Sequence, residues 1–200
     1  MLETDRAEEV LEETDMAFLF AQKYHSAMKN VGPVRKEMGE RTIFNILGPL
    51  TNPANASRQL LGVYDKELVE KLAEVLANLG VTRGTSVCGG DGLDEITVTG
   101  PTYCCEIKDG ELTSYEIIPE QFGLSTYPLA ELVGGTPEEN AQITKDILSG
   151  TLKGAKRDVV LMNAGIGIYL GSENLTMEEG IKKAEAVSYT HLRAHETLAN

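Results

Sequence analysis

The chain has 200 residues, of which 42% are hydrophobic and 24% charged, and its net charge is −13. This composition is that of a soluble globular protein with enough chain for one large core or one and a half domains. The acidic balance excludes a protein that sheathes nucleic acid, because such a protein needs a dense basic face.

The sequence has no apolar stretch of membrane-spanning length and no signal-peptide pattern. Its three cysteines include the vicinal pair Cys104 and Cys105, and vicinal cysteines rarely bridge each other. No paired Cys or His spacing suggests structural zinc. We therefore expect a cytoplasmic protein in a reducing compartment, with no membrane and no nucleic acid among its partners.

The first quarter of the chain predicts short helices. Asp5 with Glu8 forms a helix-start box, and a short apolar run follows at residues 17–21. Residues 26–38 predict helix interrupted by Gly32 and Pro33, because proline fits the first turn of a second helix. Residues 48–53, Gly-Pro-Leu-Thr-Asn-Pro, predict a rigid and irregular segment.

The rest of the chain alternates strands and helices. Residues 67–79 repeat apolar side chains at helical spacing, and residues 102–118 predict a hairpin that turns at Lys108-Asp109-Gly110. The remaining predicted elements are strands at 60–64 and 85–88 and helices that start near Thr136, Val159 and Thr176. This order predicts an α/β fold whose sheet is mostly parallel and flanked by helices.

Residues 188–200 differ from what precedes them. They contain two of the three histidines and do not continue the apolar face of the last predicted helix, which we expect to end near Val187. We therefore expect this tail not to be native to the fold, and its deletion to leave thermal stability unchanged.

The most informative stretch is Gly89-Gly90-Asp91-Gly92-Leu93-Asp94-Glu95-Ile96-Thr97. It follows a predicted strand and delivers two adjacent carboxylates, Asp94 and Glu95. Adjacent carboxylates repel each other, so a cation between them and an anionic group would stabilise the pair. Hard divalent ions such as Mg²⁺ take oxygen ligands and commonly bind protein carboxylates and substrate phosphates at the same time. The alternative is a plain surface turn, in which Asp and Gly are the expected residues.

Three further segments carry candidate site residues. His25 is followed by Ser-Ala-Met-Lys, Arg35 lies in the helix after Pro33, and residues 41–53 read Arg-Thr-Ile-Phe-Asn-Ile-Leu-Gly-Pro-Leu-Thr-Asn-Pro. Each has an ordinary alternative: a satisfied or capping histidine, a solvated charge and a tight connection between domains. As functional groups, an arginine fork suits a carboxylate, and glycine with proline lets backbone approach a flat ligand.

In this order and spacing, these segments and Asp91-Gly92-Leu93-Asp94-Glu95 resemble the anthranilate phosphoribosyltransferases, from about residue 5 to residue 187. The resemblance implies transfer of the phosphoribosyl group from phosphoribosyl pyrophosphate to anthranilate, with Mg²⁺, by an enzyme of tryptophan biosynthesis that is commonly a homodimer. It also implies an active site in a cleft between a small helical domain and an α/β domain.

The resemblance assigns roles to individual residues. It implies that Arg35 holds the anthranilate carboxylate and His25 lines the anthranilate channel. Gly48 and Pro49 would pack along the aromatic ring, and Asp94 and Glu95 would bind Mg²⁺. The implied parts of the chain are a start of the α/β part at 1–24, helices of the helical domain and cleft at 25–52, the α/β phosphoribosyltransferase domain at 53–187 and the tail at 188–200.

The family's phosphate-binding segments, Gly-Thr-Gly-Gly-Asp and Lys-His-Gly, have no match in this sequence. The chain therefore resembles the C-terminal part of the enzyme, and we expect it to be inactive in isolation and prone to associate. Two alternatives stay open. One is an enzyme like the nucleoside phosphorylases, which share the architecture but lack the acidic motif, and the other is a non-catalytic truncated remnant.

Overall fold

A computed structural model of the chain describes residues 4–25, 32, 34, 37–40 and 42–196. The chain divides into two compact units, residues 1–56 and residues 57–200. None of the helices in the described part is long and apolar enough to cross a membrane.

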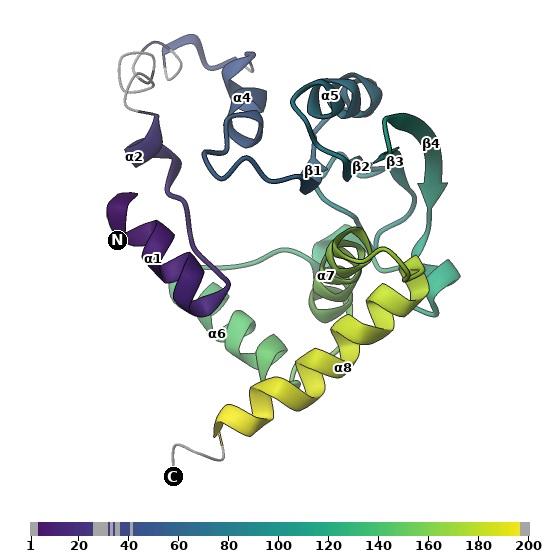
Figure 1. Cartoon of the computed structure of the whole chain (residues 1–200). Helices are drawn as coiled ribbons and strands as arrows, with labels where there is room; N and C mark the ends of the chain where they lie inside the picture. Colours follow the sequence, from purple (N-terminus) through teal and green to yellow (C-terminus); the bar gives the residue numbers. More distant parts are fainter. Residues whose placement is uncertain (1–3, 26–31, 33, 35–36, 41, 197–200) are drawn as a thin grey trace. The chain divides into compact units, whose positions relative to one another are not determined.

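The N-terminal unit contains short helices and little buried apolar surface. Helices whose bounds lie within its described residues include α1 (Thr4–Thr14), α2 (Ala21–Tyr24) and α4 (Phe44–Leu50), shown in Figure 1. Ala7 of α1 is buried, whereas Met16 and Phe18 are exposed at 76% and 75%. Most of the helix predicted at residues 26–38 lies outside the described residues.

Helix α4 corrects one prediction. The expected irregular segment begins at Gly48, but the helix continues to Leu50 with Pro49 inside it. The φ angle that proline imposes is compatible with helical backbone, but proline removes one backbone hydrogen bond and its ring crowds the carbonyl four residues earlier. The helix ends at Thr51, whose hydroxyl donates to the carbonyl of Leu47 at 2.9 Å.

The C-terminal unit is built on a four-stranded sheet in the order β1-β2-β3-β4. The strands are β1 (Arg58–Gly62), β2 (Arg83–Gly89), β3 (Thr102–Lys108) and β4 (Glu111–Ile117). Strands β1 and β2 are parallel, and β2–β3 and β3–β4 are antiparallel. The predicted α/β fold is confirmed, but the sheet is mixed, because the hairpin supplies half of its strands.

The hairpin forms where the sequence predicts it. Asp109 and Gly110 have φ angles of 52° and 85°, the left-handed conformation that a tight two-residue turn requires. Cys104 and Cys105 are neighbours on β3, so their side chains point to opposite faces of the sheet. Both are free and buried, as is Cys88.

Helices cover both faces of this sheet (Figure 1). Helix α5 (Lys66–Asn78) packs on β2 and β3, and α7 (Ala155–Gly171) packs on the opposite face. Between α7 and the sheet lies the main core, formed by Val87, Ile96, Val98, Cys104, Ile117, Ala155, Met162, Ile166 and Leu170. The remaining elements are the 3₁₀ turns η1 (Pro119–Phe122) and η2 (Leu129–Glu131) and the helices α6 (Pro137–Leu148) and α8 (Met177–Glu196).

Helix α8 packs closely against α7. A Cβ atom at Gly165 of α7 would overlap Ile181 of α8, so the glycine permits the close approach. The helix begins at the predicted box, in which the Thr176 amide donates to Glu179 at 2.8 Å. It continues to Glu196, beyond the end expected near Val187.

Candidate functional site

The candidate site lies where two parallel strands end. The carboxyl ends of β1 and β2 meet at one edge of the sheet, the edge at which α/β proteins commonly bind ligands. After β1 the chain enters α5, whose first turn is capped by the Asp65 carboxylate through the Glu67 amide at 2.9 Å. After β2 comes the acidic turn, which we define as residues 90–101.

Negative charge gathers at this edge. Burial raises the pKa of the Cys88 thiol near the end of β2, and the charges of Asp65, Asp91 and Asp94 raise it further. These three carboxylates come from the two neighbouring strand ends and act on the same buried group. The field at this edge therefore favours a cation over an anion.

Asp91 shapes the acidic turn from within. One carboxylate oxygen accepts hydrogen bonds from the Thr97 and Thr99 hydroxyls, both at 2.6 Å, and the other accepts from the Leu93 amide at 3.0 Å. Burial alone would raise the pKa of Asp91, but these hydrogen bonds outweigh it and lower the pKa. Asp91 is therefore a structural carboxylate of the turn.

The acidic turn is also seated against β1. A Cβ atom at Gly62, the last residue of β1, would overlap the backbone carbonyl of Asp94. Only glycine lets the turn come this close to the strand. On the other side, the Ile96 side chain is fully buried in the core below α7.

Asn163 of α7 holds the same part of the turn. Its side-chain oxygen accepts from the Ile96 amide at 3.0 Å, and its side-chain nitrogen donates to the Ile96 carbonyl at 2.7 Å. In the sequence, Asn163 is the polar residue that breaks the apolar run of residues 159–170. A polar side chain within such a run is a signal that a buried backbone group needs a partner.

Asp94 and Glu95 present their side chains to solvent, and both residues are exposed. Neither side chain forms a hydrogen bond or ion pair with another described residue. Partial desolvation raises the pKa of the Glu95 carboxyl, and the negative charges of Asp94 and Asp91 raise it further. The Glu95 carboxylate therefore lacks a compensating positive charge, which a bound cation would supply.

The donor set fits Mg²⁺ in its usual protein environment. Oxygen ligands from one or two carboxylates suffice, because Mg²⁺ keeps several water ligands and takes its remaining ligands from substrate phosphates. Within the described residues, no group of three or more His, Cys, Asp or Glu side chains is arranged to hold a metal ion. Asp94 and Glu95 alone would thus leave coordination positions open to phosphate oxygens.

The other predicted site residues belong to the N-terminal unit. His25 is half-buried, and its Nε2 atom lies 3.2 Å from the Thr51 hydroxyl, within hydrogen-bonding distance. Gly48 and Pro49 are exposed in the last turn of α4, and the space beside Gly48 is open. Arg35 lies outside the described residues. Within this unit, the structure brings His25 close to the end of α4.

A second polar cluster lies on the face of the sheet below α7. The buried Glu106 carboxylate of β3 accepts from the Tyr169 hydroxyl at 2.7 Å and from the Tyr115 hydroxyl at 3.0 Å. The guanidinium of Arg83 stacks 4.6 Å from the Tyr169 ring. Because Tyr169 belongs to α7, this cluster fastens the helix to the sheet.

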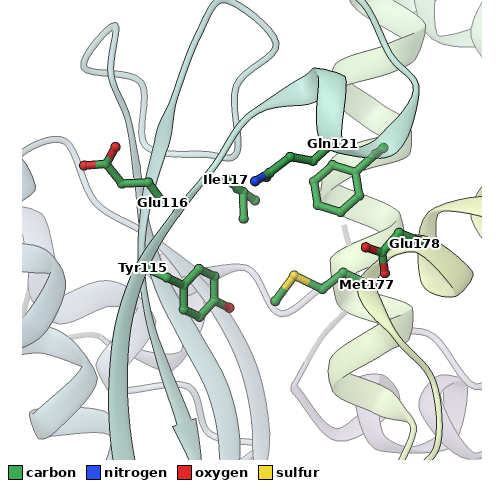
Figure 2. Close-up of a pocket in the computed structure, with 7 residues that line it drawn as sticks. Tyr115, Glu116, Ile117, Gln121, Met177 and Glu178 are labelled. Atoms are coloured by element: carbon green, nitrogen blue, oxygen red, sulfur yellow. The ribbon is translucent and has the colours of Figure 1, made fainter.

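A pocket of about 510 Å³ lies between β4, η1 and the start of α8 (Figure 2). Figure 2 shows the Met177 side chain directed toward the Tyr115 ring, with Glu116 and Glu178 at the margins. No cationic side chain lines this pocket. None of the predicted site residues lines this pocket, so the acidic turn remains the candidate site.

Comparisons with known proteins place the chain in a family. The model of the glycosyl transferase family, a/b domain, matches residues 1–190. The anthranilate phosphoribosyltransferase of Endomicrobium trichonymphae is 52% identical over 185 residues, which are 92% of this chain and 55% of that protein. The chain thus spans about half the length of the curated relatives that it matches.

Solved structures match the fold as well. Anthranilate phosphoribosyltransferase from Saccharomyces cerevisiae in complex with 4-fluoroanthranilate is 31% identical with a TM-score of 0.88, over 99% of this chain and 57% of that one. The same yeast enzyme in complex with PRPP and Mg is 31% identical with a TM-score of 0.86, over the same shares of the two chains. The chain therefore belongs to the glycosyl transferase family, a/b domain, and is similar over about half of their length to anthranilate phosphoribosyltransferases.

Proposed function

We propose that the chain is part of a cytoplasmic anthranilate phosphoribosyltransferase, in which the acidic turn binds Mg²⁺ on the pyrophosphate side of phosphoribosyl pyrophosphate. The observation that carries this proposal is the exposed Asp94–Glu95 pair at the carboxyl end of β2. The yeast relative bound to PRPP and Mg supports the same ligands here.

The reaction makes one bond and breaks one. The amine nitrogen of anthranilate bonds to C1 of the ribose, the bond from C1 to pyrophosphate breaks, and the amine loses a proton. The products are N-(5-phosphoribosyl)anthranilate and pyrophosphate. The amine needs no strong base, so the demanding part is the departure of pyrophosphate while positive charge builds on the ribose.

Asp94 and Glu95 would serve this step by holding the metal at a fixed place. A bound Mg²⁺ would supply charge stabilisation to the departing pyrophosphate oxygens. Asp91, Asn163 and Gly62 keep the backbone of the turn in position, so the carboxylates need little reorganisation when the ligand arrives. No side chain of the chain is assigned a covalent or proton-transfer role.

The anthranilate side of the site falls to the N-terminal unit. We assign the anthranilate carboxylate to Arg35, the channel to His25 and the aromatic ring to Gly48 and Pro49. The exposed surface of α4 and the open space beside Gly48 support the last assignment. In a binding titration with anthranilate, Arg35→Ala should weaken the complex by roughly 1.5–3 kcal/mol, since a charged hydrogen-bond partner is lost. Equal affinity would contradict the assignment.

The whole reaction also needs groups that bind the phosphates of phosphoribosyl pyrophosphate. The chain spans about half of its relatives' length, so we expect the isolated chain to form no product. From the family resemblance, we expect the full-length enzyme to be a homodimer. The exposed apolar side chains of the N-terminal unit, such as Met16 and Phe18, favour association of the isolated chain. Formation of phosphoribosyl anthranilate by the purified chain would contradict this expectation.

Calorimetric titration of the chain with pyrophosphate, with and without Mg²⁺, tests the metal assignment. We expect binding that requires Mg²⁺ and is lost in Asp94→Asn and Glu95→Gln. Asp109→Asn is the matched control, because it removes an exposed carboxylate at the opposite end of the sheet. Pyrophosphate binding that does not depend on Mg²⁺ would contradict the proposal. A loss of affinity in Asp109→Asn as large as in Asp94→Asn would contradict it too.

A further inference from the structure

The acidic turn has contacts that set the direction of its carboxylates, and these contacts do not touch a ligand. Ile96 is the residue next to Glu95, and both of its backbone polar groups bond to the Asn163 side chain, at 3.0 Å and 2.7 Å. This pairing imitates one rung of a β-ladder, with a carboxamide in place of a neighbouring strand. It therefore fixes the peptide plane from which the Glu95 side chain is oriented.

The Asn163 side chain is itself held in place. Its nitrogen also donates to the Val159 carbonyl in the preceding turn of α7 at 2.9 Å. Three of the four hydrogen bonds that a carboxamide can form are thus made within the protein. The orientation of the amide follows from its partners, because the Ile96 amide requires an oxygen and the two carbonyls require a nitrogen.

Helix α7 is a firm support for this contact. At its C-terminal end, the Tyr169 hydroxyl bonds to Glu106 of β3 at 2.7 Å, and Arg58 of β1 donates to the Leu170 carbonyl at 2.9 Å. Arg83 of β2 donates to the Ser172 carbonyl just beyond the helix. Along its length, Met162 and Ile166 are buried in the core against the sheet. A displacement of Asn163 would therefore require movement of the whole helix.

Gly62 limits the turn from the other side. Its missing Cβ makes room for the backbone carbonyl of Asp94, so the turn rests on β1 at Asp94 and is tied to α7 at Ile96. The two metal-binding candidates lie between these two supports. The backbone from which both carboxylates project cannot shift unless one support gives way.

We propose that Asn163 is a positioning residue of the metal site, which sets the direction of Asp94 and Glu95 through the backbone of Ile96. This inference rests on the proposed function, since it takes the acidic turn as the place where the metal binds. Residues behind metal ligands typically change metal affinity by roughly 10–100-fold when they are replaced. We expect Asn163→Leu to weaken metal binding about tenfold, near the lower end of that range.

The test measures the affinity of the full chain for Mn²⁺, used alone as the probe, from the electron paramagnetic resonance signal of free Mn²⁺. The variants are Asn163→Leu, Asn163→Ala, Leu161→Ala and Asp94→Asn. Leu161 is buried on the same helix but is not part of the cluster that contains Ile96, so Leu161→Ala controls for lost stability alone. Asn163→Ala avoids the bulk of leucine, in case Asn163→Leu does not fold.

We expect both Asn163 variants to weaken Mn²⁺ binding about tenfold. The Leu161→Ala variant should lower the melting temperature and keep the wild-type affinity. Hydrogen exchange of the peptide that contains Ile96 should be faster in the Asn163 variants, since the Ile96 amide loses its acceptor.

Two failures are distinguishable. If Asp94→Asn leaves Mn²⁺ binding unchanged, the metal does not bind at the acidic turn, and both the proposed function and this inference are wrong. If Asp94→Asn weakens binding but the Asn163 variants keep wild-type affinity, or weaken it only as much as Leu161→Ala does, the positioning role alone is wrong.

Discussion

The acidic turn and the segment around α4 carry equally clear sequence motifs, yet they are built differently. The acidic turn is tied to β1, to α7 and to its own Asp91, and Ile96 at its centre is fully buried. Gly48 and Pro49 of α4 are exposed, and the hydrogen bond at the end of this helix is a surface contact between Thr51 and His25. Contacts within the fold thus hold the acidic turn in shape without a ligand, whereas Gly48 and Pro49 are exposed and accessible to a ligand.

This difference has an energetic consequence. Substitutions of the residues that hold the acidic turn, such as Asp91, should change both stability and metal binding, because their polar groups are satisfied within the fold. Substitutions in the α4 segment should change ligand binding and leave stability nearly intact, because they remove exposed contacts. The expected effects below run from the largest to the smallest.

Gly62→Ala should have the largest effect. The added Cβ would overlap the Asp94 carbonyl, so the turn or the strand must shift, and overpacking of this kind costs about 1–3 kcal/mol. Urea denaturation should show this loss, together with weaker Mg²⁺ binding. Gly167→Ala in α7 is the matched control, since its Cβ would meet nothing within 4 Å, and it should stabilise the helix by about 0.5–1 kcal/mol. Equal stability of the two variants would contradict the seating of the turn.

Asp91→Asn should destabilise the fold by about 1–2 kcal/mol, because the charged acceptor of two hydroxyl bonds is lost. The pKa of Asp91 is lower in the folded chain than in the unfolded chain, where it is roughly 3.9. Ionised Asp91 therefore stabilises the fold fully at pH values above the unfolded-state pKa, and this stabilisation is lost as the pH falls through the folded-state pKa. Stability measured between pH 3 and pH 7 should therefore depend less on pH in Asp91→Asn than in the wild-type chain. A parallel pH dependence of the two proteins would contradict this role.

The cysteines of the C-terminal unit should be unreactive in the folded protein. Burial raises the pKa of the Cys104 thiol to about 12, with further contributions from Glu106 and Cys105. Burial likewise raises the pKa of Cys88 and Cys105. At pH 8 the thiolate fraction is small, so Ellman's reagent should label the native chain slowly and label the urea-unfolded chain fully. Rapid labelling of the native chain would show that the sheet opens readily.

Thr51→Ala should have the smallest effect on stability, within about 0.5 kcal/mol, because it removes exposed hydrogen bonds at the end of α4. Urea denaturation, as for Gly62→Ala, measures this difference. A loss as large as that of Asp91→Asn would show that the N-terminal unit depends on this contact, and the contrast between the two regions would disappear.

Local patterns were enough to predict most elements of the C-terminal unit. The apolar spacing of 67–79 predicted α5, Asp109-Gly110 predicted the hairpin turn, and the box at Thr136 predicted the start of α6. Each of these signals depends on residues close together in the chain. The prediction for the end of α8 was wrong, because the apolar spacing of residues 177–187 does not continue beyond Val187.

The contacts that hold the acidic turn could not be predicted from the sequence. Asp94 and Glu95 stood out as a pair, but the contact of Asn163 with Ile96 joins residues 67 positions apart. Gly62 is one glycine among 20, and nothing in its neighbours marks it as the point where another loop approaches. Long-range contacts of this kind follow only from the packing of α7 and β1 on the same sheet. Arg35 lies outside the described residues, so its role stays a prediction.

The most direct test of the central claim is residue-resolved NMR of the ¹⁵N-labelled chain during titration with Mg²⁺. We predict that the largest amide shifts fall on residues 92–97 and that they vanish in Asp94→Asn while Asp109→Asn keeps them. Shifts that concentrate elsewhere in the chain, or that persist in Asp94→Asn, would contradict the assignment of the acidic turn as the metal site.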